Sequence, residues 1–177
     1  MKIKIIIAYI FSIGAIISLF IMSQQNKKNK LLICKLIADV CWAIHYFFLG
    51  AFGGVIPNFL GVFRELSFSQ RGKKKFFSKI YVPIFFIAVN FTIGAFTFKQ
   101  PINIIPICAS ALVTVALWLA KPKLTKILLL PVCTAFLIYD LLINPMSLIG
   151  AINEFVSITS ITIALIKNKR NKKTTQQ

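Results

Sequence analysis

The sequence predicts an all-α membrane protein in which seven helices cross the bilayer and no soluble domain is present. Two observations lead to this fold class. Of the 177 residues, 58% are hydrophobic, with a mean hydropathy of +0.82, and the apolar residues fall in long blocks. A soluble domain of this length needs a largely polar surface, and the chain has too little polar sequence to form one.

Each apolar block is close to the roughly 20 residues that a helix needs to cross a membrane. Seven of them follow one another, at residues 5–22, 31–50, 54–69, 79–97, 102–120, 124–143 and 147–166. The joints Ala51-Phe52-Gly53 and Asn144-Pro145-Met146 are short and rich in turn formers, so each predicts a tight helical hairpin.

The order of the blocks suggests an internal repeat within a single membrane domain, residues 1–177. A first three-helix unit (5–69) and a second three-helix unit (102–166) would be joined by one linker helix (79–97). The basic tail, 167–177, is polar and is expected to be disordered.

The first block and the cysteines each allow a second interpretation. The first block follows Lys2 and Lys4 as in a secretory signal peptide, but it lacks a small-residue cleavage site, so we interpret it as a span. The four cysteines lie in apolar blocks without a Cys-x-x-Cys pair. This pattern favours buried apolar side chains over a redox site.

The basic residues predict the orientation of the chain. Outside the spans, nearly all of them fall in alternate joints and in the tail, and only Lys2, Lys4 and Lys99 fall on the other side. Because basic residues stay on the cytoplasmic side, we expect the N-terminus outside and the C-terminus in the cytoplasm. Topology therefore explains the net charge of +17 without nucleic acid as a partner. The same lysines are also compatible with anionic lipid head groups.

Polar residues inside the predicted spans are the strongest functional signal in the sequence. The chain has only four acidic residues, and all of them fall within spans: Asp39, Glu65, Asp140 and Glu154. A charge inside a membrane is expensive and marks either a buried partner or a functional site. The single histidine, His45, also lies within a span.

Helix geometry brings some of these residues to matching depths. In the first hairpin His45 and Asn58 are equally far from the turn, and deeper in the membrane Asp39 and Arg64 are again equidistant. We therefore predict an intramembrane ion pair between Asp39 and Arg64, for which Glu65 competes.

In the second hairpin Asp140 and Asn153 have the same separation as His45 and Asn58. This match predicts a substrate-binding group formed by Trp42, His45, Asn58, Asp140 and Asn153.

Each of these residues also has a purely structural interpretation. Asp39 and Arg64 are compatible with a lock that only holds the hairpin together. The asparagines are compatible with ordinary helix–helix hydrogen bonds, and Trp42 is compatible with an aromatic belt at the membrane interface.

The pattern Asp39-x-x-Trp42-x-x-His45-Tyr46-Phe47-x-Leu49-Gly50, followed by Asn58-x-x-Gly61-x-x-Arg64, resembles the YgjV-like bacterial inner-membrane proteins. The segment 100–106 and the overall length are also similar to that family. The resemblance implies a location in the bacterial inner membrane.

The family's plan is in turn similar to the SWEET, PnuC-type and PQ-loop membrane proteins, which place one asparagine from each repeat at a central pocket. This likeness implies such a role for Asn58 and Asn153. The Tyr139-Asp140 pair departs from the aromatic or histidine-bearing stretch of the relatives.

Two functions remain open at the level of sequence. The first is a transporter or facilitator of small polar solutes, with a pocket between the two three-helix units. The second is a non-transporting scaffold or sensor. One histidine and four scattered acids are a poor basis for a metal-dependent or nucleophilic enzyme, so we expect no enzyme, no cofactor and no metal. The expected partners are the bilayer and a small polar solute, and a homo-oligomer is left open.

Overall fold

The computed structural model describes residues 2–50, 52–98, 100–119, 121–142 and 148–174. These residues form seven α-helices and two short 3₁₀ helices, and they contain no β-strand. The α-helices are α1 (Lys2–Gln24), α2 (Lys28–Leu49), α3 (Phe52–Ser69), α4 (Tyr81–Thr97), α5 (Ile104–Leu119), α6 (Pro122–Leu142) and α7 (Leu148–Thr174). The 3₁₀ helices are η1 (Phe76–Ser78) and η2 (Pro101–Asn103). The predicted all-α class is confirmed.

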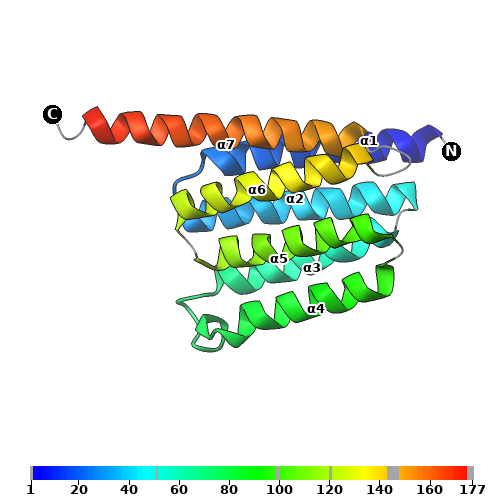
Figure 1. Cartoon of the computed structure of the whole chain (residues 1–177), viewed down its shortest axis with the longest axis horizontal. Coiled ribbons are helices and arrows are strands. Elements are labelled where there is room, and N and C mark those ends of the chain that lie inside the picture. Colours follow the sequence, from blue (N-terminus) through cyan, green and yellow to red (C-terminus); the bar gives the residue numbers. More distant parts are fainter. Residues whose placement is uncertain (1, 51, 99, 120, 143–147, 175–177) are drawn as a thin grey trace.

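The helices lie side by side with their axes roughly aligned (Figure 1). Along the chain α1, α2 and α3 pack in sequence, as do α5, α6 and α7. We call these the first group and the second group. They meet along two seams, where α1 contacts α7 and where α3 contacts α5, while α4 packs on α3 and α5.

Five helices are long and apolar enough to cross a membrane: α1, α2, α6, α7 and the segment formed by η2 and α5. Of the other two, α4 is apolar but shorter, and α3 carries Arg64 and Glu65. With 18 and 17 residues, α3 and α4 are about 26 Å long, close to the thickness of about 30 Å of a hydrocarbon core. Seven spans and the repeat of two three-helix units stay predictions.

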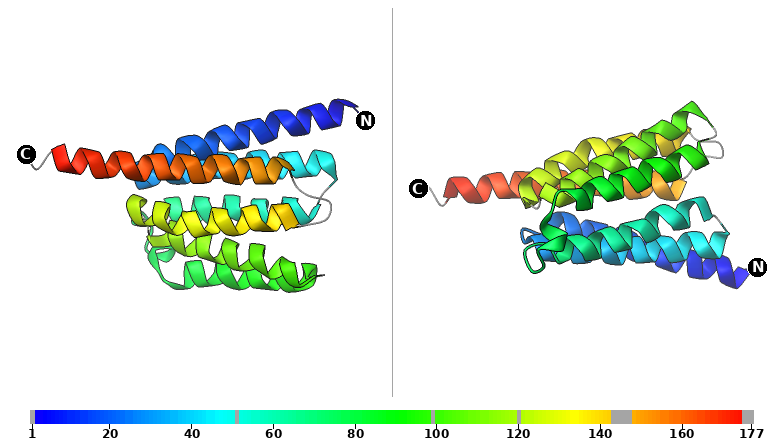
Figure 2. Two further views of the ribbon diagram at one scale, coloured as in Figure 1. Left: turned by 45° about the horizontal axis from the view of Figure 1, so that its top comes forward. Right: turned by 90° about the horizontal axis from the view of Figure 1, so that it is seen from below.

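One end of the bundle carries most of the described basic residues, and we call it the basic end. It holds the joints between α1 and α2, between α3 and α4 and between α5 and α6, together with the last turns of α7 (Figure 1). The N-terminus lies at the opposite end. In the right-hand view of Figure 2, the axes of α5 and α6 diverge from those of α1 and α2 toward that opposite end.

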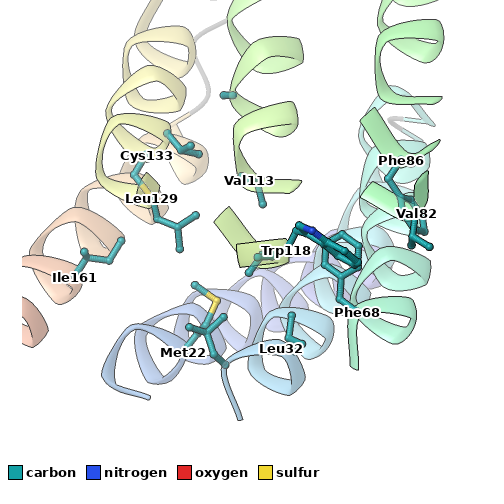
Figure 3. Close-up of a cluster of buried hydrophobic side chains, with 14 residues drawn as sticks. Met22, Leu32, Phe68, Val82, Phe86, Val113, Trp118, Leu129, Cys133 and Ile161 are labelled. Atoms are coloured by element: carbon teal, nitrogen blue, oxygen red, sulfur yellow. The ribbon is translucent and has the colours of Figure 1, made fainter. Parts of the chain in front are cut away.

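The buried apolar core lies largely near the basic end (Figure 3). Met22, Phe68 and Trp118 are each close to the end of a helix there, and Leu32 and Val82 are close to the start of one. Many large apolar side chains point away from the bundle, as expected for helices that face lipid. Between α1 and α2, inside the first group, the small buried residues Ala8, Ser12 and Ala15 allow a close approach of the helices.

One local feature differs from the sequence-based expectation. The turn of the first hairpin is made by Gly50, which adopts a left-handed conformation with φ of 72°, while α3 already begins at Phe52. Pro57 and Pro131 lie inside α3 and α6, whereas Pro83 and Pro106 lie in the first turns of α4 and α5, where proline removes no helical hydrogen bond. The predicted joint at 144–146 lies outside the described residues.

The basic tail, 167–177, was expected to be disordered, and for residues 167–174 this expectation is wrong. Helix α7 continues to Thr174. No proline or glycine follows Gly150, so nothing in the sequence breaks the helix. Lysines near a helix C-terminus also interact favourably with the helix dipole.

The orientation can be tested with single cysteines in a variant whose four native cysteines are replaced. A membrane-impermeant thiol reagent added to intact cells should label Gln100→Cys, which is exposed at the opposite end, and should leave Lys74→Cys at the basic end unlabelled until the cells are lysed. Labelling of Lys74→Cys in intact cells would overturn the predicted orientation.

Candidate functional site

Four charged side chains form a cluster inside the bundle: Lys35 and Asp39 from α2, and Arg64 and Glu65 from α3. Asp39 is 2% exposed, Glu65 1% and Arg64 7%, and the side chain of Lys35 is 16% exposed. Removing one partner from a buried group of charges leaves another charge uncompensated, which is strongly destabilising. The four side chains must therefore be considered together.

Arg64 is the centre of this cluster. Its Nε and Nη2 atoms donate to Glu65 Oε1 at 3.0 and 2.8 Å, and its Nη2 lies 3.7 Å from Asp39 Oδ2. Its Nη1 donates to Thr114 Oγ1 of α5 at 3.1 Å. One guanidinium thus connects α3 with α2 inside the first group and with α5 in the second group.

Asp39 has a closer cationic partner than Arg64. Lys35 Nζ contacts Asp39 Oδ1 one helical turn away on α2. The contact predicted between Asp39 and Arg64 is present at 3.7 Å. Glu65, the predicted competitor, lies closer to Arg64, at the hydrogen-bond distance of 2.8 Å. Lys35 was not among the predicted site residues, although its i,i+4 spacing from Asp39 is a visible signal.

Gly61 makes room for the Asp39 carboxylate. A Cβ atom at this position would collide with Asp39 Oδ2 and would lie 3.0 Å from Asp39 Cγ. The absence of a side chain therefore lets α3 approach α2 closely enough for the carboxylate to lie between the two backbones. This close approach is the physical reason for a glycine at position 61, three residues before Arg64.

A second polar group lies nearer the opposite end, around Glu154 of α7. Asn153 Nδ2 donates to Glu154 Oε1 at 2.8 Å, and Cys133 of α6 lies beside this carboxyl group. The charges of Asp140 and Lys35 act on Glu154 as well, and Tyr46 of α2 interacts electrostatically with both Asp140 and Glu154. Side chains of both groups of helices thus act on one another electrostatically here.

Three buried oxygen atoms have no hydrogen-bond partner among the described residues: Asp39 Oδ2, Glu65 Oε2 and Asn153 Oδ1. An acceptor without a partner is costly in a buried site. The two polar groups can therefore accept a further hydrogen bond from a water molecule or a solute, or bind a proton.

The five predicted substrate-binding residues lie on four helices, α2, α3, α6 and α7. His45 Nδ1 lies 2.8 Å from the carbonyl oxygen of Ala8 on α1, and because a carbonyl only accepts, this nitrogen carries the hydrogen. The Trp42 ring lies edge-on to His45, with 5.2 Å between the ring centroids. Both side chains are buried, and the His45 bond joins α1 to α2 inside the first group.

The other three predicted residues lie on α3, α6 and α7. Asn153 and Asp140 belong to the polar group around Glu154, and Asn58 is half-buried on α3. A shared cavity for all five stays a prediction. A recess of about 350 Å³ between α5 and α6 is lined by Cys108 and otherwise by apolar side chains, and none of the five lines it.

The seam between α1 and α7 is closed by polar contacts near the basic end. The hydroxyl groups of Ser23 and Ser160 are in contact, and Gln24 Nε2 donates to both the carbonyl and the hydroxyl oxygen of Ser160 at 3.0 Å. Just beyond α1, Asn26 Oδ1 accepts from Lys126 Nζ of α6 at 3.0 Å and from Asn168 Nδ2 of α7 at 3.3 Å.

The seam between α3 and α5 is closed at the same end by an arginine. Arg71, just after α3, donates to the carbonyl oxygen of Trp118 on α5, and its guanidinium lies 4.0 Å from the centroid of the Trp118 ring. Trp118 also packs edge-on against Phe68 at 5.2 Å. These contacts of Arg71 and Lys126 were not predicted, because nothing in a single sequence shows which loop charge folds back onto the bundle.

Comparison with known families agrees with this architecture. Residues 6–172 match the family model Imp-YgjV, described as a bacterial inner membrane protein. The chain belongs to this family. The match confirms the resemblance drawn from the sequence and indicates a multi-pass protein of the bacterial inner membrane. No curated protein and no solved structure matches the chain.

The described residues of this family member offer no group of three histidine, cysteine, aspartate or glutamate side chains placed to hold a metal ion. Asp39 and Glu65 are paired with cations, and Glu154 accepts a hydrogen bond from Asn153.

Replacing Gly61 by alanine should lower the stability of the protein by about 1–3 kcal/mol, because the added methyl group overpacks the site of the Asp39 carboxylate. Thermal unfolding in detergent measures this loss. Gly14→Ala is the matched control, since its Cβ would meet Cys41 Sγ at an ordinary 3.6 Å. Equal stability of the two variants would contradict the close approach at Gly61.

Replacing Arg64 should lower the stability of the protein more than replacing Gly61. Arg64→Ala leaves Glu65 buried without its cation, so we expect a loss of about 3–5 kcal/mol in the free energy of unfolding. The double variant Arg64→Ala/Glu65→Ala should recover part of the loss, and Lys74→Ala in an exposed joint should change stability by less than about 0.5 kcal/mol. A double variant less stable than Arg64→Ala would argue against the pairing.

Proposed function

We propose that this protein is a transporter or facilitator of small polar solutes in the bacterial inner membrane. In this proposal the first group (α1–α3) and the second group (α5–α7) move against each other, and α4 connects them. The observation that carries it is the closure of both seams at the basic end, by Ser23, Gln24 and Asn26 on one side and by Arg71 on the other.

The arrangement fits one state of an alternating-access cycle. The two groups are tied together at the basic end, which the topology prediction assigns to the cytoplasm, and they diverge toward the opposite end (Figure 2). The polar group around Glu154 lies toward that opposite end and draws side chains from both groups. A solute entering from outside would meet this group first, and rocking of one group against the other would then expose it to the cytoplasm.

The chemistry around Glu154 indicates the kind of solute. Asp140, Glu154 and Asn153 offer acceptor oxygens, and Tyr46 adds a hydroxyl group next to them. Such a set favours a small molecule with several hydrogen-bond donors, such as a polyol or an amine, over an anion. In this proposal Asp140 and Asn153 keep the substrate-binding role assigned from the sequence, whereas Trp42 and His45 support it from inside the first group.

A second function, a non-transporting scaffold or sensor, is favoured by a different observation. His45 is engaged with the backbone of α1 rather than with the second group, and the recess between α5 and α6 is apolar. In that case the charge cluster serves only to hold the helices together.

The solute can be sought by thermal unfolding of the purified protein with a panel of sugars, nucleosides, vitamin precursors and amines. A ligand at 100 times its Kd should stabilise the folded state by about 2.7 kcal/mol. A dose-dependent shift with one chemical class is the expected result. A flat response across the panel, from protein shown to be folded, would favour the scaffold or sensor.

The movement can be tested by locking the basic end. In a variant without native cysteines, Ser23→Cys with Ser160→Cys should form a disulfide across the seam, and oxidation should stop counterflow of the identified solute in proteoliposomes until a reductant is added. The control is Gly14→Cys with Cys41 retained, a cross-link between α1 and α2 inside the first group, which should leave counterflow unchanged. Full counterflow through the locked seam would exclude rocking at this end.

A further inference from the structure

Lys126 is a buried cation without an acid in contact. It lies about 6 Å along α6 from Pro122, at the basic end, and only 1% of the residue is exposed. A buried charge without a partner of opposite sign is expensive. The cluster formed by α2 and α3 does not include Lys126, because its two cations and two carboxylates already compensate one another.

The four acids of the chain all lie away from Lys126. Asp39 and Glu65 are in contact with the cations of the cluster. Asp140 is about 21 Å from Lys126 along the axis of α6, and Glu154 lies toward the same opposite end on α7. None of the three ion pairs formed by the described residues involves Lys126. The chain therefore provides no counter-charge for this ammonium group.

The ammonium group of Lys126 also has hydrogen-bond donors to spare. An ammonium group carries three donors, and among the described residues this one makes a single hydrogen bond, to Asn26 Oδ1 at 3.0 Å. The same oxygen accepts from Asn168 Nδ2 of α7 at 3.3 Å. Two donors from the second group of helices thus converge on one neutral acceptor, which belongs to the joint between α1 and α2.

The surface around this contact is cationic. Asn26 is exposed, so the contact lies close to the surface of the basic end. The first turn of α6 holds no acidic residue, and a helix N-terminus adds a partial positive charge. The exposed lysines of the three segments that meet here are Lys27, Lys121, Lys123, Lys167 and Lys169. An anion at this place must therefore come from outside the chain.

We propose that the basic end binds a phosphate group where the joint between α1 and α2 meets α6 and α7, with Lys126 as its main ligand. A phosphate group combines negative charge with several acceptor oxygens. It can accept the spare hydrogens of the Lys126 ammonium group and those of the Asn26 and Asn168 amides. The site does not rest on the proposed transport function.

Two sources of phosphate can reach this site. The topology prediction assigns the basic end to the cytoplasmic surface of the membrane, where the head groups of anionic phospholipids lie, and free phosphate is present in the cytoplasm. In either case the ligand would contact Asn26 from the first group and Lys126 and Asn168 from the second group. A bound phosphate should therefore stabilise the closed seam at this end.

The experiment is thermal unfolding of the full chain, washed free of lipid in a maltoside detergent, which contains no phosphate. One arm compares sodium phosphate with sodium chloride at equal ionic strength. The other compares phosphatidylglycerol with a glycolipid of the same acyl chains. We expect a rise in unfolding temperature with sodium phosphate if the source is free phosphate, and with phosphatidylglycerol alone if the source is a lipid. No rise in either arm would overturn the proposal.

A pair of lysine variants tests whether Lys126 is responsible for the rise. Lys126→Met should abolish it, and the variant should fold, because an apolar replacement for a buried charge is often neutral or stabilising. Lys123→Met is the matched control, since it removes the same charge from an exposed position on the same helix, and it should keep the rise. A full rise in Lys126→Met, or its loss in Lys123→Met, would show that the surface charge alone attracts phosphate and would overturn the site.

Asn26→Asp provides an independent measurement at an exposed position. The substitution places a carboxylate where Lys126 now has a neutral acceptor. It should raise the unfolding temperature in the absence of phosphate and remove most of the response to added phosphate or phospholipid. Both effects should disappear when Lys126→Met is added to the same chain. An Asn26→Asp variant that responds to phosphate or phospholipid as strongly as the wild type would contradict the proposal.

Discussion

The structure depends on the need to keep Arg64 paired in an environment where water cannot solvate it. A guanidinium cannot lose its proton, so a bundle that buries it must supply acceptors around it. Glu65, Thr114 and Asp39 provide these acceptors from three different helices. The arginine thereby determines how α2, α3 and α5 approach one another. The place of Gly61 and the pairing of Lys35 with Asp39 follow from the same requirement, because each positions the carboxylate that faces the guanidinium.

The two ends of the bundle differ in how they are held together. At the basic end the side chains that close the seams are long or polar, and they lie where loop charges can bend back onto helix ends, as Arg71 does on Trp118. Large apolar side chains such as Phe68 fill the space beneath them. Toward the opposite end the helices diverge, and the polar residues belong to the spans themselves. This asymmetry is what a protein that opens at one side at a time requires, and it is the physical basis of the function proposed above.

Particular residues show where sequence reasoning succeeded and where it failed. The contact between Asp39 and Arg64 was predictable, because two helices joined by a short turn have a known register. The contact of His45 with Ala8 on α1 was not, because register gives depth but not the direction in which a side chain points. Lys35 and Glu154 were visible as charged residues within or beside spans, yet only the structure shows that Lys35 contacts Asp39 and that Glu154 accepts from Asn153.

The sequence by itself determined that this chain is a helical membrane protein, which of its ends is basic and which polar residues lie within its apolar segments. These properties depend on composition and on distances along a single helix, so local patterns carry them. The tertiary structure decided which charges share a partner. It also decided that the seams are closed at the basic end. Those properties depend on how each helix is rotated about its axis and on which helix packs beside it. The physical reason is that apolar lipid-facing surfaces of similar composition leave this rotation to the few polar contacts inside the bundle.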